Sequence, residues 1–194
     1  MTLGPVQVHL VVMREMESEL VKKAANFAQN AHQGAVRKYN GAPYITHPAR
    51  VAAAVANLEG ATSEMVAAAW LHDVVEDTTI TLDVVQKEFG EVVAHLVKWL
   101  TNDPKVPGEN RAARKKKNAV RLSGAPKDAQ KIKMLDRMDN LREMDLVQDR
   151  GFAKVYLEES WDLLYAVGNS DRDLAERFEA VLNMIGQELG IEKR

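Results

Sequence analysis

The sequence contains no cysteine, which excludes a disulfide framework and any metal site built on thiolates. A metal ion would therefore have to be bound by histidine and carboxylate side chains. The sequence also lacks any stretch in which apolar and polar residues alternate over the length of a β-strand. Its apolar residues recur at the spacing of a helix face instead, so we expect an all-α fold, a single-domain helical bundle.

Long hydrophobic runs and a strong charge of either sign are also missing. The apolar stretch at residues 6–13 is short and is interrupted by Gln7 and His9, which argues against a signal peptide or a membrane span there. A formal net charge of −2 gives no general attraction to nucleic acid or to an acidic membrane surface. We therefore expect a cytoplasmic protein with no nucleic-acid or membrane partner, in which anions bind only to local clusters of cations.

The sequence does contain enough apolar material for one hydrophobic core. Its 194 residues are 46% hydrophobic and 28% charged, as is usual for a soluble globular protein. We expect one domain over residues 17–194, after an N-terminal extension, residues 1–16, that is disordered or loosely docked.

Thr46 and Thr62 should cap the helices that they begin. Periodicity and turn residues place the helices at 17–33, 46–58, 62–77, 82–89, 91–100, 109–122, 127–146, 152–167 and 171–189.

The most unusual stretch is residues 70–78, where a histidine and three acidic residues fall within six positions of an otherwise apolar helix. These four residues are His72, Asp73, Glu76 and Asp77. Spacings of three and four residues would crowd them on one side of a helix. Crowding carboxylates beside apolar residues is costly unless a cation or a proton relieves it. A divalent metal ion is the simplest explanation.

A candidate ligand set for that ion consists of His47, His72, Asp73 and Asp136. Two imidazoles and two carboxylates suit Mn²⁺ or Fe²⁺, with Zn²⁺ as a further option. Four ligands on a six-coordinate ion would leave positions for water and substrate, as hydrolysis requires. Spacing alone is weak evidence, because these residues come from three predicted helices, and a structural or surface role for the His72-Asp73 pair is the alternative.

Glu76 and Asp77 are candidate acid/base groups that orient water and pass a proton to a leaving group. The alternative is a pair of exposed acids at the end of a helix. His32, near the end of the first helix, either supports the ligands from behind or caps that helix. His9 and His95 are expected to take no part.

Cations for a phosphate-rich substrate are found in two predicted loops and one basic run. Arg37 and Lys38 lie in the first loop, Lys105 in the second, and the run extends from Arg111 to Arg121. Such side chains offset phosphate charge, and an arginine plane can stack on a purine. For residues 115–117 within the run, a solvated helix face is the alternative. A further polar group is Asn140, which lies four residues after Asp136, so that both can face one pocket.

Taken together, these segments resemble a known family. The matching segments are AHQG at 31–34, RK at 37–38, GAPYITHP at 41–48, LHDVVEDT at 71–78, FG at 89–90, KMLDR at 133–137 and NLR at 140–142. In order and spacing they are similar to the HD hydrolase domain of RelA/SpoT-type proteins, over about residues 20–145. The chain resembles the stand-alone small alarmone hydrolases of that family.

The resemblance implies an all-helical HD fold that binds Mn²⁺ and removes the 3′-pyrophosphate of ppGpp and pppGpp, leaving GDP or GTP. It implies metal ligands at His47, His72, Asp73 and Asp136. It also implies that Glu76 and Asp77 position and activate water. Substrate contacts are implied at Arg37 and Lys38, which match the loop that meets guanine and phosphates, and at Asn140.

Four positions depart from the family pattern: Ala35, Leu135, Asp139 and Glu143. Glu143 lies where the long enzymes carry threonine. None of the four changes a predicted ligand or catalytic acid. An additional carboxylate near the pocket would repel a polyphosphate, so these positions bear on nucleotide preference.

Two other functions remain open on the sequence alone. One is a phosphatase acting on another 2′- or 3′-phosphorylated nucleotide, such as NADPH, and the other is a non-catalytic module that senses alarmone. The two acids Glu76 and Asp77 argue against a pure sensor, which has no need to activate water. The apolar face of the last helix either closes the core or forms a homodimer contact; its residues are Phe178, Val181, Leu182 and Ile185.

Overall fold

The computed structural model describes residues 18–104 and 107–191. The expected N-terminal extension, residues 1–16 with His9, and the candidate Lys105 lie outside these ranges. Within them the secondary structure is helical apart from one isolated bridge between Val36 and Pro43, which confirms the all-α fold. The chain forms two compact units. The first contains Met1–Val36 and Ala42–Thr101, and the second contains Arg37–Gly41 and Asn102–Arg194.

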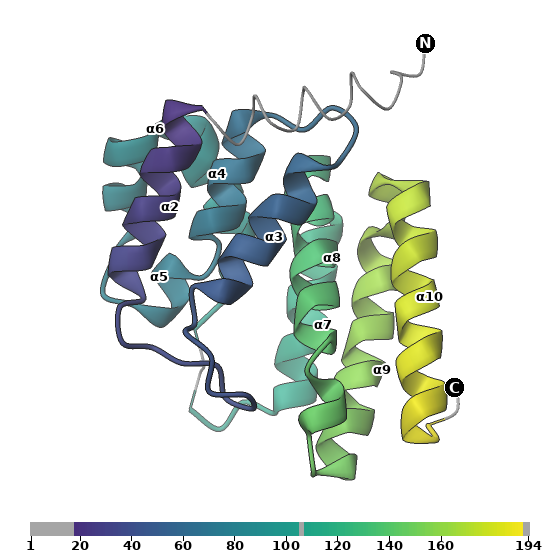
Figure 1. The fold of residues 1–194 in the computed structure, drawn as a ribbon. Coiled ribbons are helices and arrows are strands. Elements are labelled where there is room, and N and C mark those ends of the chain that lie inside the picture. Colours follow the sequence, from purple (N-terminus) through teal and green to yellow (C-terminus); the bar gives the residue numbers. More distant parts are fainter. Residues whose placement is uncertain (1–17, 105–106, 192–194) are drawn as a thin grey trace. The chain divides into compact units, whose positions relative to one another are not determined.

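The first unit is built around one alanine-rich helix. Its helices are α2 (Glu19–Ala31), α3 (Thr46–Ala56), α4 (Ser63–Leu71), α5 (Val74–Asp77) and α6 (Leu82–Leu100). Helix α4 packs against α2, α3 and α6, and Figure 1 shows it beside α2 and α3. Residues 65–69 and Leu71 of α4 are all buried. Three alanines in that stretch let neighbouring helices approach closely, so α4 forms the centre of this unit.

The two predicted threonine caps have different outcomes. The Thr62 side chain accepts a hydrogen bond from the Met65 backbone N–H and caps α4, as expected. The prediction for Thr46 was wrong, because Thr46 is the first residue inside α3. Its hydroxyl donates to the Pro43 carbonyl at 2.8 Å, so it closes the preceding turn and does not cap the helix.

The predicted continuous helix at 62–77 is wrong at its most important point. It is divided into α4, which ends at Leu71, and α5, which begins at Val74, with His72 and Asp73 between them. The His72 ring nitrogen Nδ1 lies 2.7 Å from the Ala69 carbonyl oxygen. That oxygen is the acceptor that a continuous helix would offer to the Asp73 N–H, so the side chain competes with the helix for it.

Helix α6 contains the two segments predicted at 82–89 and 91–100, joined at a kink. Gly90 at the junction has φ 85° and ψ 172°, a conformation that glycine adopts and other residues rarely do. The glycine therefore turns the chain without ending the element.

The second unit is a separate helical bundle. Its helices are α7 (Arg111–Ser123), α8 (Lys127–Leu141), α9 (Arg150–Val167) and α10 (Arg172–Leu189). Helices α8, α9 and α10 pack on one another, and α7 packs on α9 (Figure 1). The predicted helix at 127–146 was too long, since α8 ends at Leu141 and a 3₁₀ turn, Met144–Leu146, follows after two residues.

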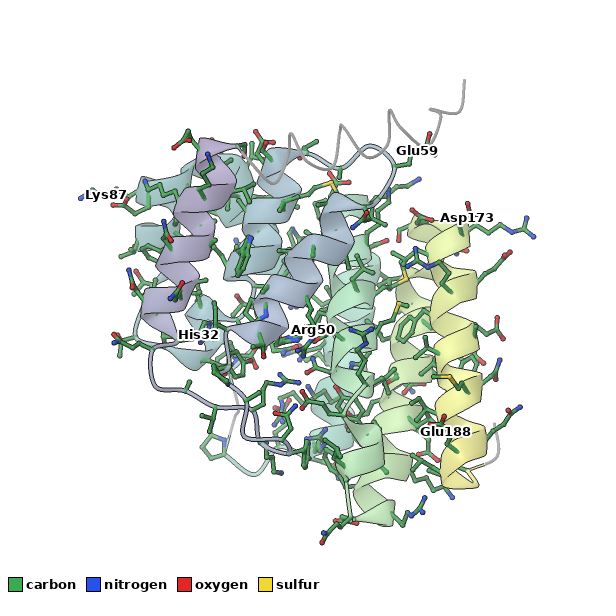
Figure 2. The ribbon with its side chains drawn as sticks, in the orientation of Figure 1. His32, Arg50, Glu59, Lys87, Asp173 and Glu188 are labelled. Carbon is green, nitrogen blue, oxygen red and sulfur yellow. The ribbon has the colours of Figure 1, made fainter. Side chains whose placement is uncertain are left out.

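The apolar face of α10 closes the core of this unit. Phe178 and Leu182 are fully buried and Ile185 nearly so, whereas Asp173 and Glu188 stand outward near opposite ends of the helix (Figure 2). Of the two alternatives for this face, these three residues serve the core. Among the described helices, none is both long enough and apolar enough to cross a membrane.

Candidate functional site

Three of the four predicted metal ligands converge in the first unit. His47 comes from the first turn of α3, and His72 and Asp73 come from the break between α4 and α5. The two Nε2 atoms are 3.1 Å apart, and Asp73 Oδ2 lies 3.1 Å from His72 Nε2 and 3.6 Å from His47 Nε2. Both rings are fully buried. The break in the helix thus places two adjacent side chains on one point.

The donor set of this trio, His47, His72 and Asp73, fits a divalent cation. Because a carbonyl can only accept, His72 Nδ1 carries the hydrogen toward Ala69, and the lone pair of the neutral ring is at Nε2. That lone pair and the Asp73 carboxylate would repel each other without a proton or cation between them. Ligands about 2.1 Å from one ion are about 3.0 Å apart at right angles, close to the distances found here.

Tyr44 contacts two acidic side chains, Asp73 and Asp77, and no role for it was predicted from the sequence. Its hydroxyl lies 2.6 Å from Asp73 Oδ2 and 2.9 Å from Asp77 Oδ2. Burial, and next the charge of Asp73, raise the pKa of Tyr44 well above its usual range, so the phenol stays protonated and donates. The only signal in the sequence is its place in the GAPYITHP segment, three residues before His47.

The two predicted catalytic acids lie on α5, directly after the trio. Both Glu76 and Asp77 reach the surface. Partial burial, and next the charge of Asp73, raise the pKa of Asp77, so its carboxyl holds a proton more readily than a free aspartate does. A carboxyl group with that property, beside a phenol donor, is suited to accept and return a proton.

His32 lies where α2 ends, as Figure 2 shows, and its backbone N–H donates to the Ala28 carbonyl. Its buried ring packs against Tyr44 with the ring centres 4.8 Å apart. Burial lowers the pKa of His32 and the Asp73 charge opposes that effect only in part, so the ring is mainly neutral at pH 7. His32 is therefore the C-cap of α2, and its ring also packs on Tyr44, whose hydroxyl contacts Asp73.

In the second unit, the predicted pair of Asp136 and Asn140 forms a hydrogen bond on α8. Asn140 Nδ2 donates to Asp136 Oδ1 at 2.7 Å, and Lys133 Nζ lies 2.7 Å from Asp136 Oδ2. All three side chains belong to this unit, whereas the trio belongs to the first. The assignment of Asp136 as the fourth ligand therefore stays a prediction.

The candidate substrate cations of the second unit differ in surroundings. Arg37 is buried, and its guanidinium donates from Nε to Glu143 Oε1 and from Nη2 to Asn140 Oδ1, each at 2.9 Å. Lys38 is exposed, with Nζ 5.0 Å from the Tyr39 ring centre. The Arg37 guanidinium is held by two hydrogen bonds, whereas the Lys38 ammonium is accessible to an anion.

The basic run at 111–121 is only partly a solvated helix face. Lys116 and Lys117 are exposed, as that alternative predicted. Lys115 instead points into the unit, where burial, and next the neighbouring charge of Arg137, lower its pKa to about 8. Arg111 forms a two-pronged ion pair with Glu159, at 2.9 and 3.0 Å.

Two buried imidazoles and a carboxylate on an all-helical scaffold are typical of helical proteins that bind a metal ion. Comparison with a family model identifies the family. The model described as "HD domain" matches residues 24–167, so the chain belongs to the HD domain family. The motifs that suggested this family from the sequence lie inside the matched range.

The chain is also similar to two relatives with assigned names. The chain is 31% identical over 177 residues to guanosine-3′,5′-bis(diphosphate) 3′-pyrophosphohydrolase of Mus musculus, covering 90% of this chain and 97% of the relative. It is also 31% identical over 141 residues to the enzyme of that name from Aquifex aeolicus, covering 73% of this chain and 20% of the relative.

A solved structure is similar to this chain as well. It is described as a metazoan ortholog of SpoT that hydrolyzes ppGpp, and it aligns with 90% of this chain and 98% of its own. The TM-score is 0.75 at 26% sequence identity. The likeness to this ppGpp-hydrolysing ortholog thus extends over most of the chain.

Proposed function

We propose that this protein hydrolyses the 3′-pyrophosphate of guanosine 3′,5′-bis(diphosphate) and its 5′-triphosphate analogue, releasing pyrophosphate and GDP or GTP. The observation that carries the proposal is the convergence of His47, His72 and Asp73 on one point with distances that suit a shared ion. Relatives that match most of the chain carry this activity in their names.

We assign the ion as Mn²⁺, with Fe²⁺ and Zn²⁺ as less favoured alternatives, because imidazole and carboxylate ligands without thiolate suit such ions. Asp136 is proposed as the fourth ligand on the strength of its motif, KMLDR, alone. When bound, a divalent ion supplies Lewis-acid polarisation of a phosphate oxygen and acidifies water.

The side chains of this protein would supply the remaining chemistry. Glu76 and Asp77 would orient the attacking water and transfer its proton, and Tyr44 would keep Asp73 and Asp77 in fixed positions through its hydroxyl. Holding two acids by one phenol restricts their rotamers before substrate arrives, which lowers the entropy cost of reaching the reactive geometry.

Substrate binding is assigned to cations and one amide of the second unit. Arg37 and Lys38 would contact the guanine and phosphates, Asn140 would offer an amide, and Lys105 would add a further charge. The partner is a small guanosine polyphosphate, with no nucleic acid or membrane involved, and we place the protein in the cytoplasm. A homodimer would have to use a surface other than the buried face of α10.

Product analysis by ion-exchange chromatography tests the proposal. The purified protein is incubated with ppGpp in Mn²⁺, and separately in EDTA. GDP and pyrophosphate should appear only with metal, and Glu76→Gln should abolish their release while the variant still binds Mn²⁺. Intact ppGpp in both samples would refute the assigned reaction. NADPH is the next substrate to test in that case, and ppGpp binding without turnover would identify a sensor.

A further inference from the structure

Glu143 is a buried carboxylate whose hydrogen-bond donors come from a distant part of the sequence. It follows the end of α8 and is only 5% exposed. A buried carboxylate is costly unless donors surround it. The donors found here belong to the segment Arg37–Gly41, about a hundred residues earlier in the chain.

Glu143 binds that segment at two places. Its Oε1 accepts from Arg37 Nε at 2.9 Å and from Asn40 Nδ2 at 3.2 Å. The Arg37 and Glu143 side chains are 9% and 7% exposed, so water competes little for this ion pair. Glu143 Oε1 thus binds both Arg37, the first residue of the segment, and Asn40, three positions later.

The guanidinium is also held at a second nitrogen. Arg37 Nη2 donates to Asn140 Oδ1 at 2.9 Å, and Asn140 Nδ2 donates in turn to Asp136 Oδ1 at 2.7 Å. A planar guanidinium bound at two nitrogens has a fixed plane as well as a fixed position. A hydrogen-bonded chain therefore runs from Glu143 through Arg37 and Asn140 to Asp136, all within the second unit.

We propose that Glu143 is a positioning and specificity residue, which fixes the Arg37 guanidinium for substrate and cancels its charge. This inference rests on the proposed function, in which Arg37 contacts the nucleotide. Without the Glu143 carboxylate, the charge of Arg37 would be offset less and would attract phosphate more strongly. With glutamate the ion pair is neutral, so an added phosphate gains less attraction here, and the protein favours the less charged of two guanosine polyphosphates.

Two substitutions at Glu143 distinguish the positioning of Arg37 from the cancellation of its charge. Glu143→Gln keeps an oxygen that can accept from Arg37 but removes the negative charge, and Glu143→Ala removes both. Glu176→Ala, at an exposed glutamate on α10, is the control. Steady-state kinetics are measured for ppGpp and pppGpp with each variant.

Glu143→Ala should raise KM for ppGpp by about tenfold or more with a much smaller change in kcat, because the loss of the orienting charge-assisted hydrogen bond outweighs the added attraction of the freed charge. Glu143→Gln should largely restore that KM and should raise the ratio of kcat/KM for pppGpp over ppGpp at least about threefold. An unchanged KM in Glu143→Ala, or an unchanged ratio in Glu143→Gln, would overturn the corresponding half of the proposal.

A measurement that needs no turnover keeps the test independent of the proposed function. The Arg37 Nε–H signal in ¹⁵N spectra, assigned with Arg37→Lys, should be protected from solvent exchange in the wild-type protein and Glu143→Gln, and should broaden in Glu143→Ala. An inactive wild-type protein with this pattern would refute the reaction and retain the positioning. A signal that does not respond to Glu143→Ala would refute the positioning, whatever the activity.

Discussion

At the scale of single residues, the decisive features are side chains held by neighbours that are distant in the sequence. Tyr44 reaches Asp73 across 29 positions, and Arg37 reaches Glu143 across 106. His72 and Asp73 could be predicted from the sequence, because acids crowded among apolar residues are conspicuous. Tyr44 could not, since a tyrosine in a loop has no local signature, and its partners depend on how the chain folds.

Tyr44→Phe tests the role of the phenol. The substitution retains the ring that packs on His32 and removes the hydroxyl that holds Asp73 and Asp77. We expect Mn²⁺ affinity or kcat/KM to fall by about 10- to 100-fold, as is usual when a group that orients a ligand is lost. Tyr165→Phe, at an exposed tyrosine, should change neither quantity. Wild-type values for both in Tyr44→Phe would show that the phenol has no positioning role.

Lys115 gives a prediction about pH. Its pKa is lowered to about 8 in the folded protein from 10.5, so the unfolded chain binds more protons between these values and stability rises with pH across that window. Below pH 8 the folded protein bears the full cost of the charge. Lys115→Met should therefore raise the free energy of unfolding at pH 7 by about 1–2 kcal/mol, after allowance for solvent screening.

The advantage of Lys115→Met should shrink as the pH rises from 8 toward 10.5, where the wild-type lysine is also neutral when folded. Urea unfolding at a series of pH values measures this difference. Lys116→Met, at the exposed neighbour, should show no such trend. A destabilised Lys115→Met at pH 7 would mean that the lysine is stabilised by its neighbours and would contradict the account.

At the scale of elements, helical periodicity predicts where helices lie but not where a side chain interrupts them. The paired segments of α6 and the capped start of α4 agree with the sequence. The break at His72 and Asp73 does not, because it depends on the His72 ring binding the Ala69 carbonyl. That competition between a side chain and the helix is a property of the folded surroundings and leaves no mark on the apolar pattern.

Gly90→Ala tests the kink in α6. A methyl group at this position meets no atom within 4 Å, so the substitution changes backbone strain alone. At φ 85° we expect a loss of about 1–2 kcal/mol in the free energy of unfolding, measured by urea denaturation. Gly124→Ala is the matched control, because its φ is −92° and should tolerate alanine. Equal stability of the two variants would show that the kink is relaxed.

At the scale of the whole molecule, the residues that match the family pattern are divided between two compact units. The first contributes His47, His72 and Asp73, and the second contains Asp136 with Arg37 and Asn140. The sequence assigned them to one site through the resemblance, since periodicity alone says nothing about which helices meet. Each unit holds its own group in place: the first by Tyr44 and the second by Glu143.

We propose that the trio of the first unit holds an ion that hydrolysis requires. The most direct measurement titrates Mn²⁺ into the metal-free protein, follows free Mn²⁺ by electron paramagnetic resonance, and records the initial rate of pyrophosphate release from ppGpp in the same samples. We expect about one bound ion per chain and a rate that rises in proportion to occupancy. In Asp73→Asn, which keeps the shape of the side chain, affinity and rate should fall together. Full activity without bound ion, or Mn²⁺ affinity unchanged in Asp73→Asn, would refute the proposed metal site.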